Sequence, residues 1–286
     1  MTFHEFRQLF SLKLSSLYST REIRALLHRY VEAKLNIPIH HFYLNPFETF
    51  FLTQEIIDNL HRLENGEPIQ YVLGYTDFCG LQMNVSPDVL IPRPETEELV
   101  AEILRLCALH SKEKKGNILD LGTGSGAIAI ALATHLPDYH LIAIDFSENV
   151  IEIAKQNAEK HNVKIDFQVW DMLTMPLPPH WKNKFDVIVS NPPYIPYHEK
   201  KIMHDNVRKF EPATALFVPD DNPLLFYRRI ADIGREVLAT SGKIAFEIHE
   251  HFHEELQVLL QEFDYHNITI IKDVYNKPRM IFCEKK

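Results

Sequence analysis

The residues best suited to chemistry are the tetrad Asn191-Pro192-Pro193-Tyr194, which directly follows the apolar run Phe185–Ser190. The run predicts a buried parallel strand, and the two prolines end it because neither offers an N–H to a neighbouring strand. The Asn191 side-chain oxygen and the Pro192 carbonyl oxygen can then accept both hydrogens of one planar NH2 group, on which the Tyr194 ring can stack. The tetrad predicts a site that holds and polarises an amide or amino nitrogen, although a plain strand-to-loop exit would use the same residues.

A glycine-rich loop follows the predicted strand 117–121 and precedes an alanine-rich helix. It consists of Gly122, Thr123, Gly124, Ser125 and Gly126. Glycines let the backbone turn sharply and lie against a ligand, and the helix N-terminus offers free N–H groups to an anionic or carboxylate-bearing ligand. The third glycine comes one residue earlier than in the dinucleotide motif Gly-x-Gly-x-x-Gly, so room for a pyrophosphate is less evident.

Two carboxylates stand at the ends of the next two predicted strands. Asp145 lies 19 residues after Gly126, where a carboxylate can accept both hydroxyls of a ribose. Asp171 is placed to meet an adenine edge, with Met172 beside it as apolar cover. The carboxyl ends of parallel strands meet at one edge of a sheet, so we expect these residues to face the same ligand as the glycine loop.

The elements that position these residues alternate between strand and helix from about residue 117 onward. We predict strands at 117–121, 140–145, 164–169, 185–190, 243–248, 268–272 and 279–283, and helices at 127–135, 148–161, 223–239 and 251–263. This alternation predicts an α/β fold, a doubly wound and mostly parallel sheet with helices on both faces. A hairpin at 273–278 would make the end of the sheet antiparallel.

The first 72 residues have a different pattern, typical of a small helical bundle. One apolar stripe runs through Phe3, Phe6, Phe10 and Leu14, and a capping box at 19–22 opens a second helix. A third helix is expected from about residue 46 to about 65. Alternation over 69–92 predicts a β-hairpin, and a helix is expected over 96–110. We therefore expect three parts: a helical domain 1–72, a hairpin linker 73–92 and an α/β domain 93–286.

Composition limits the partners and the compartment. The 286 residues carry a formal net charge of −9, which argues against an independent grip on nucleic-acid phosphates. The three cysteines, at 79, 107 and 283, are scattered and lack metal-site spacing, as suits a reducing compartment. Neither a cleavable leader nor an apolar run of about 18 residues is visible. We expect a cytoplasmic protein with no membrane partner and no direct nucleic-acid partner.

Taken together, the segment 120–126, Asp145, Asp171 and the tetrad resemble the seven-stranded class of S-adenosylmethionine-dependent methyltransferases. Within that class, Asn-Pro-Pro-Tyr marks enzymes that methylate planar nitrogens. Three more segments, 66–74, 90–97 and 210–216, are similar to the peptide chain release factor N5-glutamine methyltransferases. The chain departs from that family after the fifth strand, where it has Glu247-Ile248-His249 instead of the frequent Glu-Ile-Gly.

The resemblance implies methyl transfer from S-adenosylmethionine to the side-chain nitrogen N5 of the glutamine in the Gly-Gly-Gln motif of a release factor, a protein methylation in translation termination. It implies that residues 1–72 dock the release factor and that the protein is a monomer. The implied catalytic and substrate-binding residues are Asn191, Pro192, Pro193 and Tyr194. The implied cofactor-binding residues are Gly122, Thr123, Gly124, Ser125, Gly126, Asp145, Asp171, Met172 and Asn191.

Two other functions fit parts of the pattern. A DNA or RNA amino-methyltransferase would use the same tetrad, but it should show a basic cleft for phosphates. A binding module that kept the fold without the activity would not need every cofactor-facing position intact.

Several charged residues have two readings. His249, Glu250 and His253 match the zinc motif His-Glu-x-x-His, yet they fit the solvated first turn of a surface helix and lack a third ligand, so we predict no metal. Arg93 and Glu95 are either ordinary charges at the start of a helix or residues that close over the cofactor. Glu211, in the segment after the tetrad, could similarly order that loop or merely cap it.

Overall fold

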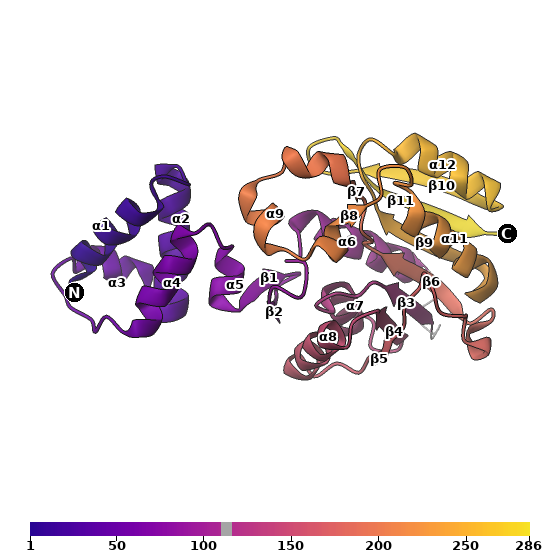
Figure 1. Ribbon diagram of the computed structural model, residues 1–286. Coiled ribbons are helices and arrows are strands. Elements are labelled where there is room, and N and C mark those ends of the chain that lie inside the picture. The colour runs from indigo at the N-terminus through magenta and orange to yellow at the C-terminus, as the bar shows by residue number, and fades with distance from the viewer. Residues whose placement is uncertain (110–115) are drawn as a thin grey trace. The chain divides into compact units, whose positions relative to one another are not determined.

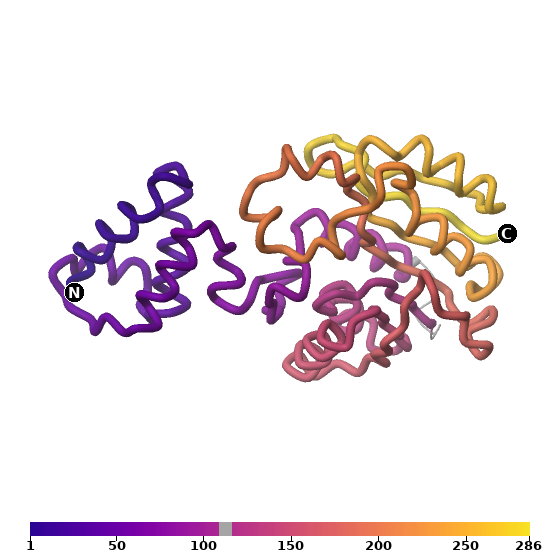
Figure 2. The backbone as a smooth tube through the Cα atoms, in the orientation of Figure 1, coloured from indigo at the N-terminus to yellow at the C-terminus, as the bar shows by residue number. Residues whose placement is uncertain are grey.

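The computed structural model describes residues 1–109 and 116–286 and contains two compact units. Unit 1 comprises Met1–Tyr75 and His204–Phe210, and unit 2 comprises Thr76–Met203 and Glu211–Lys286. Figure 2 traces the backbone of both units. In the part of the chain that is described, no helix is long and apolar enough to cross a membrane.

Unit 1 is helical and has its own aromatic core. Its helices are α1 (Phe3–Leu14), α2 (Thr20–Tyr30), the π-helical η1 (Val31–Leu35), α3 (Ile39–Leu44), α4 (Gln54–Glu64), α5 (Ile69–Leu73) and α9 (Asp205–Phe210). The predicted stripe of α1 is buried, with Phe6 and Phe10 both 0% exposed. The predicted capping box at Ser19 is present, because its side chain accepts from the Glu22 N–H while Glu22 accepts from the Ser19 N–H.

Two sequence expectations in unit 1 are wrong. The helix expected from residue 46 begins only at Gln54, because the Thr53 side chain caps it and the preceding chain runs along α1, where the Phe3 N–H donates to the Glu48 carbonyl. Residues 69–73, expected to belong to the hairpin, form α5 instead. This short helix ends at Gly74, whose φ of 85° is the left-handed conformation that terminates helices.

The hairpin itself is a two-stranded sheet of β1 (Tyr75–Phe78) and β2 (Leu81–Asn84). Its two turn residues, Cys79 and Gly80, both have positive φ, which matches the twist of a tight two-residue hairpin. The side chain of Asn157 binds the backbone of Asn84 through an N–H at 2.7 Å and a carbonyl at 3.0 Å. The hairpin is thereby fastened to helix α8 (Glu148–Lys160).

Unit 2 is built on a seven-stranded sheet, which confirms the predicted α/β class. The strands are β3 (Asn117–Leu121), β4 (His140–Asp145), β5 (Asp166–Val169), β6 (Phe185–Ser190), β9 (Leu238–Glu247), β10 (Tyr265–Lys272) and β11 (Pro278–Lys285). Their order is β10-β11-β9-β6-β3-β4-β5, with β11 antiparallel to both neighbours and the other pairs parallel. The order in which successive strands are added to the sheet reverses between β3 and β6, and sheets of this kind bind ligands at such a point.

Helices cover both faces of this sheet (Figure 1). Alternate residues of β3 point to opposite sides: Ile118 packs with α6 (Pro94–Leu109) and α7 (Ala127–His135), and Leu119 packs with α11 (Leu225–Val237) and α12 (His253–Glu262). Strand β9 begins five residues earlier than the predicted residue 243, so α11 ends at Val237 and not at 239. Shorter elements are η2 (Pro179–Trp181), β7 (Ile195–Pro196), η3 (Tyr197–Lys201), α10 (Ala213–Leu216) and β8 (Phe217–Val218).

Candidate active site

A cavity of about 410 Å³ lies at the carboxyl edge of the sheet, beside the reversal between β3 and β6. Its size is that of a small-molecule site. Of the residues that sequence reasoning assigned to a site, those lining it are Gly122, Thr123, Gly124, Ser125, Asp145, Asp171, Met172, Asn191, Pro192 and Pro193. The structure thus brings together residues from the ends of β3, β4, β5 and β6.

The glycine loop owes its shape to three residues with positive φ, at 79° for Gly122, 54° for Gly124 and 82° for Gly126. The first two line the cavity, whereas Gly126 packs the start of α7 against the neighbouring helix. A Cβ built on Gly126 would lie 3.0 Å from the Ile130 side chain and 3.1 Å from the Ala154 Cβ. The loop therefore presents backbone to the cavity while its last glycine holds two helices close.

Asp145 stands at the end of β4 as expected and is almost fully buried. Its carboxylate accepts from the Gly124 N–H at 3.1 Å, which ties it to the glycine loop. Burial raises the pKa of Asp145, and backbone N–H groups, led by that of Gly124, oppose the rise. A buried acceptor at the cavity wall is suited to a ligand that brings its own hydroxyl donors.

Asp171 and Met172 also line the cavity, but the carboxylate of Asp171 is already engaged locally. Its two oxygens accept from the Leu173 N–H at 2.9 Å and from the Thr174 hydroxyl at 2.6 Å. Met172 is buried and presents an apolar wall. Contact of Asp171 with an adenine edge stays a prediction.

The tetrad residues divide between the cavity and the interior behind it. Asn191, Pro192 and Pro193 line the cavity, whereas Tyr194 is not among the described residues that do so. The Tyr194 hydroxyl donates to Glu247 Oε1 at 3.0 Å, and its ring meets the His249 ring edge-on at 6.0 Å. Burial raises the pKa of Tyr194, and the nearby charge of Glu247 raises it further. Stacking of Tyr194 on a substrate stays a prediction.

Thr96, Glu247 and Phe146 are residues of this site that sequence reasoning did not assign to it. Thr96, in the first turn of α6, lines the cavity and accepts from the Asn191 side-chain N–H at 3.2 Å. Glu247, the last residue of β9, is 1% exposed and accepts from the Thr96 hydroxyl at 2.5 Å. Phe146 follows Asp145, lines the cavity and is 57% exposed, so it offers a ligand an apolar ring. The position of an acid at a strand end was the available signal for Glu247.

The electrostatics of Glu247 follow from its burial. Burial raises the pKa of its carboxyl, while the hydroxyls of Thr96 and Tyr194 and the charge of Arg279 oppose that rise. Each carboxyl oxygen lies within hydrogen-bond distance of a hydroxyl group, so each oxygen has a donor when Glu247 is ionised.

Arg93 is not an isolated charge at the start of a helix. Its guanidinium pairs with Glu211 Oε1 at 2.5 Å, and Glu211 Oε2 accepts from the Ile91 N–H at 3.2 Å. Glu211 is 6% exposed and precedes Pro212, which lines the cavity. The ion pair therefore orders the segment after the tetrad at the cavity wall. Glu95 makes no such ion pair with any residue that the structure describes.

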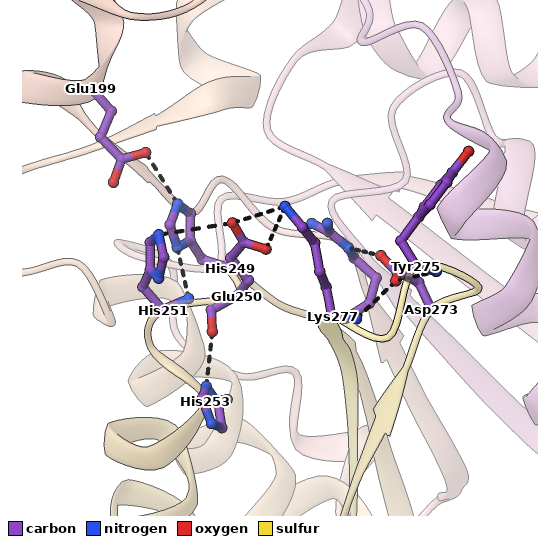
Figure 3. Close-up of polar contacts among 9 residues, drawn as sticks. Glu199, His249, Glu250, His251, His253, Asp273, Tyr275 and Lys277 are labelled. Carbon is purple, nitrogen blue, oxygen red and sulfur yellow. Dashed lines mark hydrogen bonds and ion pairs between the residues drawn. The ribbon is translucent and has the colours of Figure 1, made fainter.

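The histidine-rich segment 249–253 does not converge on one point (Figure 3). His249 Nε2 lies 3.2 Å from Glu199 Oε2, His253 Nδ1 lies 2.8 Å from the Glu250 carbonyl, and the Glu250 carboxylate pairs with Lys277. Among the described residues, no group of three or more His, Cys, Asp or Glu side chains is arranged to hold a metal ion. The expected first helical turn here is wrong, because α12 begins at His253.

Known proteins share the sequence and the fold of this chain. A family described as "Methyltransferase domain" matches residues 112–218. A release factor glutamine methyltransferase of Bacteroides thetaiotaomicron is 41% identical over 81% of this chain and 81% of its own. One from Flavobacterium psychrophilum is 39% identical over 98% of both chains. Among solved structures, a methyltransferase from Pyrococcus furiosus is 18% identical, with a TM-score of 0.52, over 80% of this chain and 98% of that one, which shows a shared fold.

Proposed function

The chain belongs to the release factor glutamine methyltransferase family, and from this premise we propose that it methylates the glutamine side chain of a bacterial release factor. The proposed acceptor is the amide nitrogen N5 of the Gly-Gly-Gln motif, and the proposed donor is S-adenosylmethionine. The observation that carries the proposal is one cavity lined by both the glycine loop with Asp145 and the Asn191-Pro192-Pro193 platform.

The residues present fit this methyl donor. The left-handed Gly122 and Gly124 leave backbone, without a Cβ, against the cavity, and Asp145 offers a buried acceptor for ribose hydroxyls. Met172 and Phe146 supply apolar surface for a purine. When bound, S-adenosylmethionine supplies a methyl carbon attached to a positively charged sulfur.

On the acceptor side, the platform must hold a poor nucleophile. The lone pair of an amide nitrogen is delocalised into its carbonyl, so the nitrogen reacts only when it is oriented and its growing positive charge is favoured. Asn191 Oδ1 and the Pro192 carbonyl would each accept one hydrogen of the NH2 group. These two hydrogen bonds would orient the nitrogen and would favour its growing positive charge. The prolines keep these oxygens in place because their φ angles are fixed.

The proton balance needs no dedicated base. As the nitrogen forms its bond to the methyl carbon, the carbon–sulfur bond breaks and the sulfur keeps the electron pair. The nitrogen becomes cationic and then loses one of its two hydrogens to water. Asn191 Oδ1 and the Pro192 carbonyl would each hold one of the two hydrogens until one of them leaves.

Selection of a release factor belongs to the helical part of the chain in this proposal. A glutamine pocket offers only a few hydrogen bonds, so discrimination must come from surface away from the nitrogen. Unit 1 displays large apolar side chains at Leu44, Phe47 and Phe51, exposed by 76%, 83% and 83%. We keep the proposed division into a docking domain 1–72, a linker 73–92 and a methyltransferase domain 93–286, in a monomer that acts in the cytoplasm.

The test is methyl transfer from S-adenosylmethionine carrying a labelled methyl group. Purified release factor, release factor with glutamine of the Gly-Gly-Gln motif replaced by alanine, and an adenine-containing oligonucleotide are compared, with mass analysis of the Gly-Gly-Gln peptide. We expect label only on the unaltered release factor, at one glutamine. Label on the oligonucleotide, or on the altered release factor, would contradict the proposal.

A further inference from the structure

A chain of hydrogen bonds runs from the cavity wall into the interior of unit 2. The Asn191 side-chain N–H donates to Thr96 Oγ1 at 3.2 Å, and the Thr96 hydroxyl donates to Glu247 Oε2 at 2.5 Å. The other carboxyl oxygen of Glu247 accepts from the Tyr194 hydroxyl at 3.0 Å. Two residues of the tetrad are therefore anchored to one buried carboxylate, from segments far apart in the sequence.

The direction of each bond follows from the groups involved. The Thr96 hydroxyl donates to Glu247 Oε2, so its single hydrogen points at the carboxyl group. The Thr96 oxygen can then only accept from Asn191, which must turn its NH2 group toward Thr96. The other end of that amide, Oδ1, is left for the cavity that Asn191 lines. Glu247 thus decides which of the two amide orientations Asn191 adopts.

This orientation is the one that the reaction needs. Oδ1 can accept a hydrogen from a substrate NH2 group, whereas a flipped amide would present two hydrogens to it and repel it. The buried carboxyl group of Glu247 also stands behind Asn191 and, when ionised, favours the positive charge that grows on the reacting nitrogen. Thr96 is 4% and Glu247 1% exposed, so bulk water does not compete for the hydrogen bond between them.

We propose that Thr96 and Glu247 are positioning residues that fix the side-chain amide of Asn191 with its oxygen toward the substrate and hold the hydroxyl of Tyr194 behind it. The inference rests on the proposed function for the identity of the substrate nitrogen. It adds that a threonine of α6 and a glutamate of β9 act on the rate through Asn191.

The kinetic test compares Thr96→Val with Thr96→Ser. Valine keeps the shape without the hydroxyl, so kcat on release factor should fall by about tenfold to a hundredfold while the affinity for S-adenosylmethionine stays within about threefold. Serine restores the hydroxyl and should recover most of the rate. Thr76→Val, at another buried threonine of unit 2, controls for the loss of any buried hydroxyl. An unchanged kcat in Thr96→Val would overturn the proposal.

A double-mutant cycle separates positioning from general damage. If Thr96 acts through Asn191, then Thr96→Val should change the residual rate of Asn191→Ala by no more than about twofold. The same loss in both backgrounds would mean that Thr96 acts by another route. Glu247→Gln repeats the cycle in case Thr96→Val folds poorly, because an amide has only one oxygen to accept two hydroxyl hydrogens.

A substrate-free readout keeps this inference separate from the proposed function. In protein labelled with nitrogen-15 at asparagine, the Asn191 NH2 signal is identified by its absence from Asn191→Ala. The signal should shift on Thr96→Val and return toward its original position in Thr96→Ser, whatever the substrate is. An unmoved signal would overturn the inference, while a shift without activity on any release factor would count against the proposed function alone.

Discussion

Asp145 is the residue on which affinity for the methyl donor should depend most. It is buried at the cavity wall, and a carboxylate that accepts hydroxyl hydrogens contributes about 1.5–3 kcal/mol to binding. Asp145→Ala should therefore weaken S-adenosylmethionine binding by about tenfold to a hundredfold in calorimetric titration. Asp166→Ala, at an exposed carboxylate of the same sheet, is the matched control. Equal affinities in the two variants would remove Asp145 from the site.

A second buried carboxyl, Asp120, makes stability depend on pH. Burial raises the pKa of Asp120 to about 7 from an ordinary value of 3.8, and a hydrogen bond from Thr123 opposes the rise. The folded protein therefore holds this proton more tightly than the unfolded chain, so the contribution of Asp120 is fully present below about pH 4 and is lost as pH rises through 7.

Asp120→Asn, which carries no charge at any pH, should lack this loss. In urea unfolding, the variant should gain stability relative to the natural protein between pH 4.5 and pH 8, by on the order of 4 kcal/mol at most. A difference between the two proteins that stays constant across this range would show that Asp120 does not titrate there.

Among single residues, the sequence predicted those site residues that belong to short motifs. Gly122, Gly124, Asp145 and Asn191 reach the cavity as expected, because each stands at the end of a strand whose place in the sheet could be inferred. Glu247 also stands at the end of a strand, but its contact with Thr96 could not be found in the same way. The two residues are 151 positions apart and meet because α6 and β9 pack together.

At the scale of elements, substitutions in the glycine loop before α7 should distinguish effects on protein stability from effects on ligand binding. Gly126 has a left-handed φ and lies between Ile130 and Ala154, whereas no described residue beyond its two chain neighbours comes within 4 Å of a Cβ built on Gly124. Gly126→Ala should lower the free energy of unfolding by about 2–4 kcal/mol, since alanine would cause both backbone strain and overpacking there.

Gly124→Ala should lower the free energy of unfolding by only about 1–2 kcal/mol, which is the effect of backbone strain alone. No described residue beyond the two chain neighbours crowds the new methyl group. Since Gly124 lines the cavity, that methyl group should instead weaken S-adenosylmethionine binding. Urea unfolding and calorimetric titration of both variants make the comparison. Equal losses of stability would show that the contact between α7 and α8 does not need a glycine.

The elements themselves were largely predictable where apolar periodicity was strong. Strands β3, β4 and β6 match their expected bounds, because buried parallel strands are short apolar runs. The errors fall where tertiary contacts decide. Residues 46–53 look apolar enough for a helix but run along α1, and β9 extends back to Leu238, which pairs with Phe185 of β6.

For the molecule as a whole, the docking role of unit 1 leads to a test on intact and minimal substrates. Phe47→Ser with Phe51→Ser removes two large exposed apolar side chains and should leave the core intact. The KM for intact release factor should rise by about tenfold or more, since exposed aromatic side chains are common anchors of interfaces.

Methylation of a short Gly-Gly-Gln peptide should not change in this variant, because the peptide reaches only the cavity. Val274→Ser with Tyr275→Ser, which are 80% and 76% exposed in unit 2, is the matched control. A rise in KM for the peptide as large as that for the protein would argue that these residues support the active site instead.

The place of β11 in the sheet has a consequence for synthesis. Strand β9 is complete at residue 247, but its outer neighbour is β11, at 278–285, and not the earlier β10, which pairs only with β11. While the ribosome is still adding the segment between them, the outer edge of β9 carries unpaired backbone groups, and β10 has no partner in this sheet. The seven-stranded sheet can therefore be completed only after β11, the last of the described strands, has been synthesised.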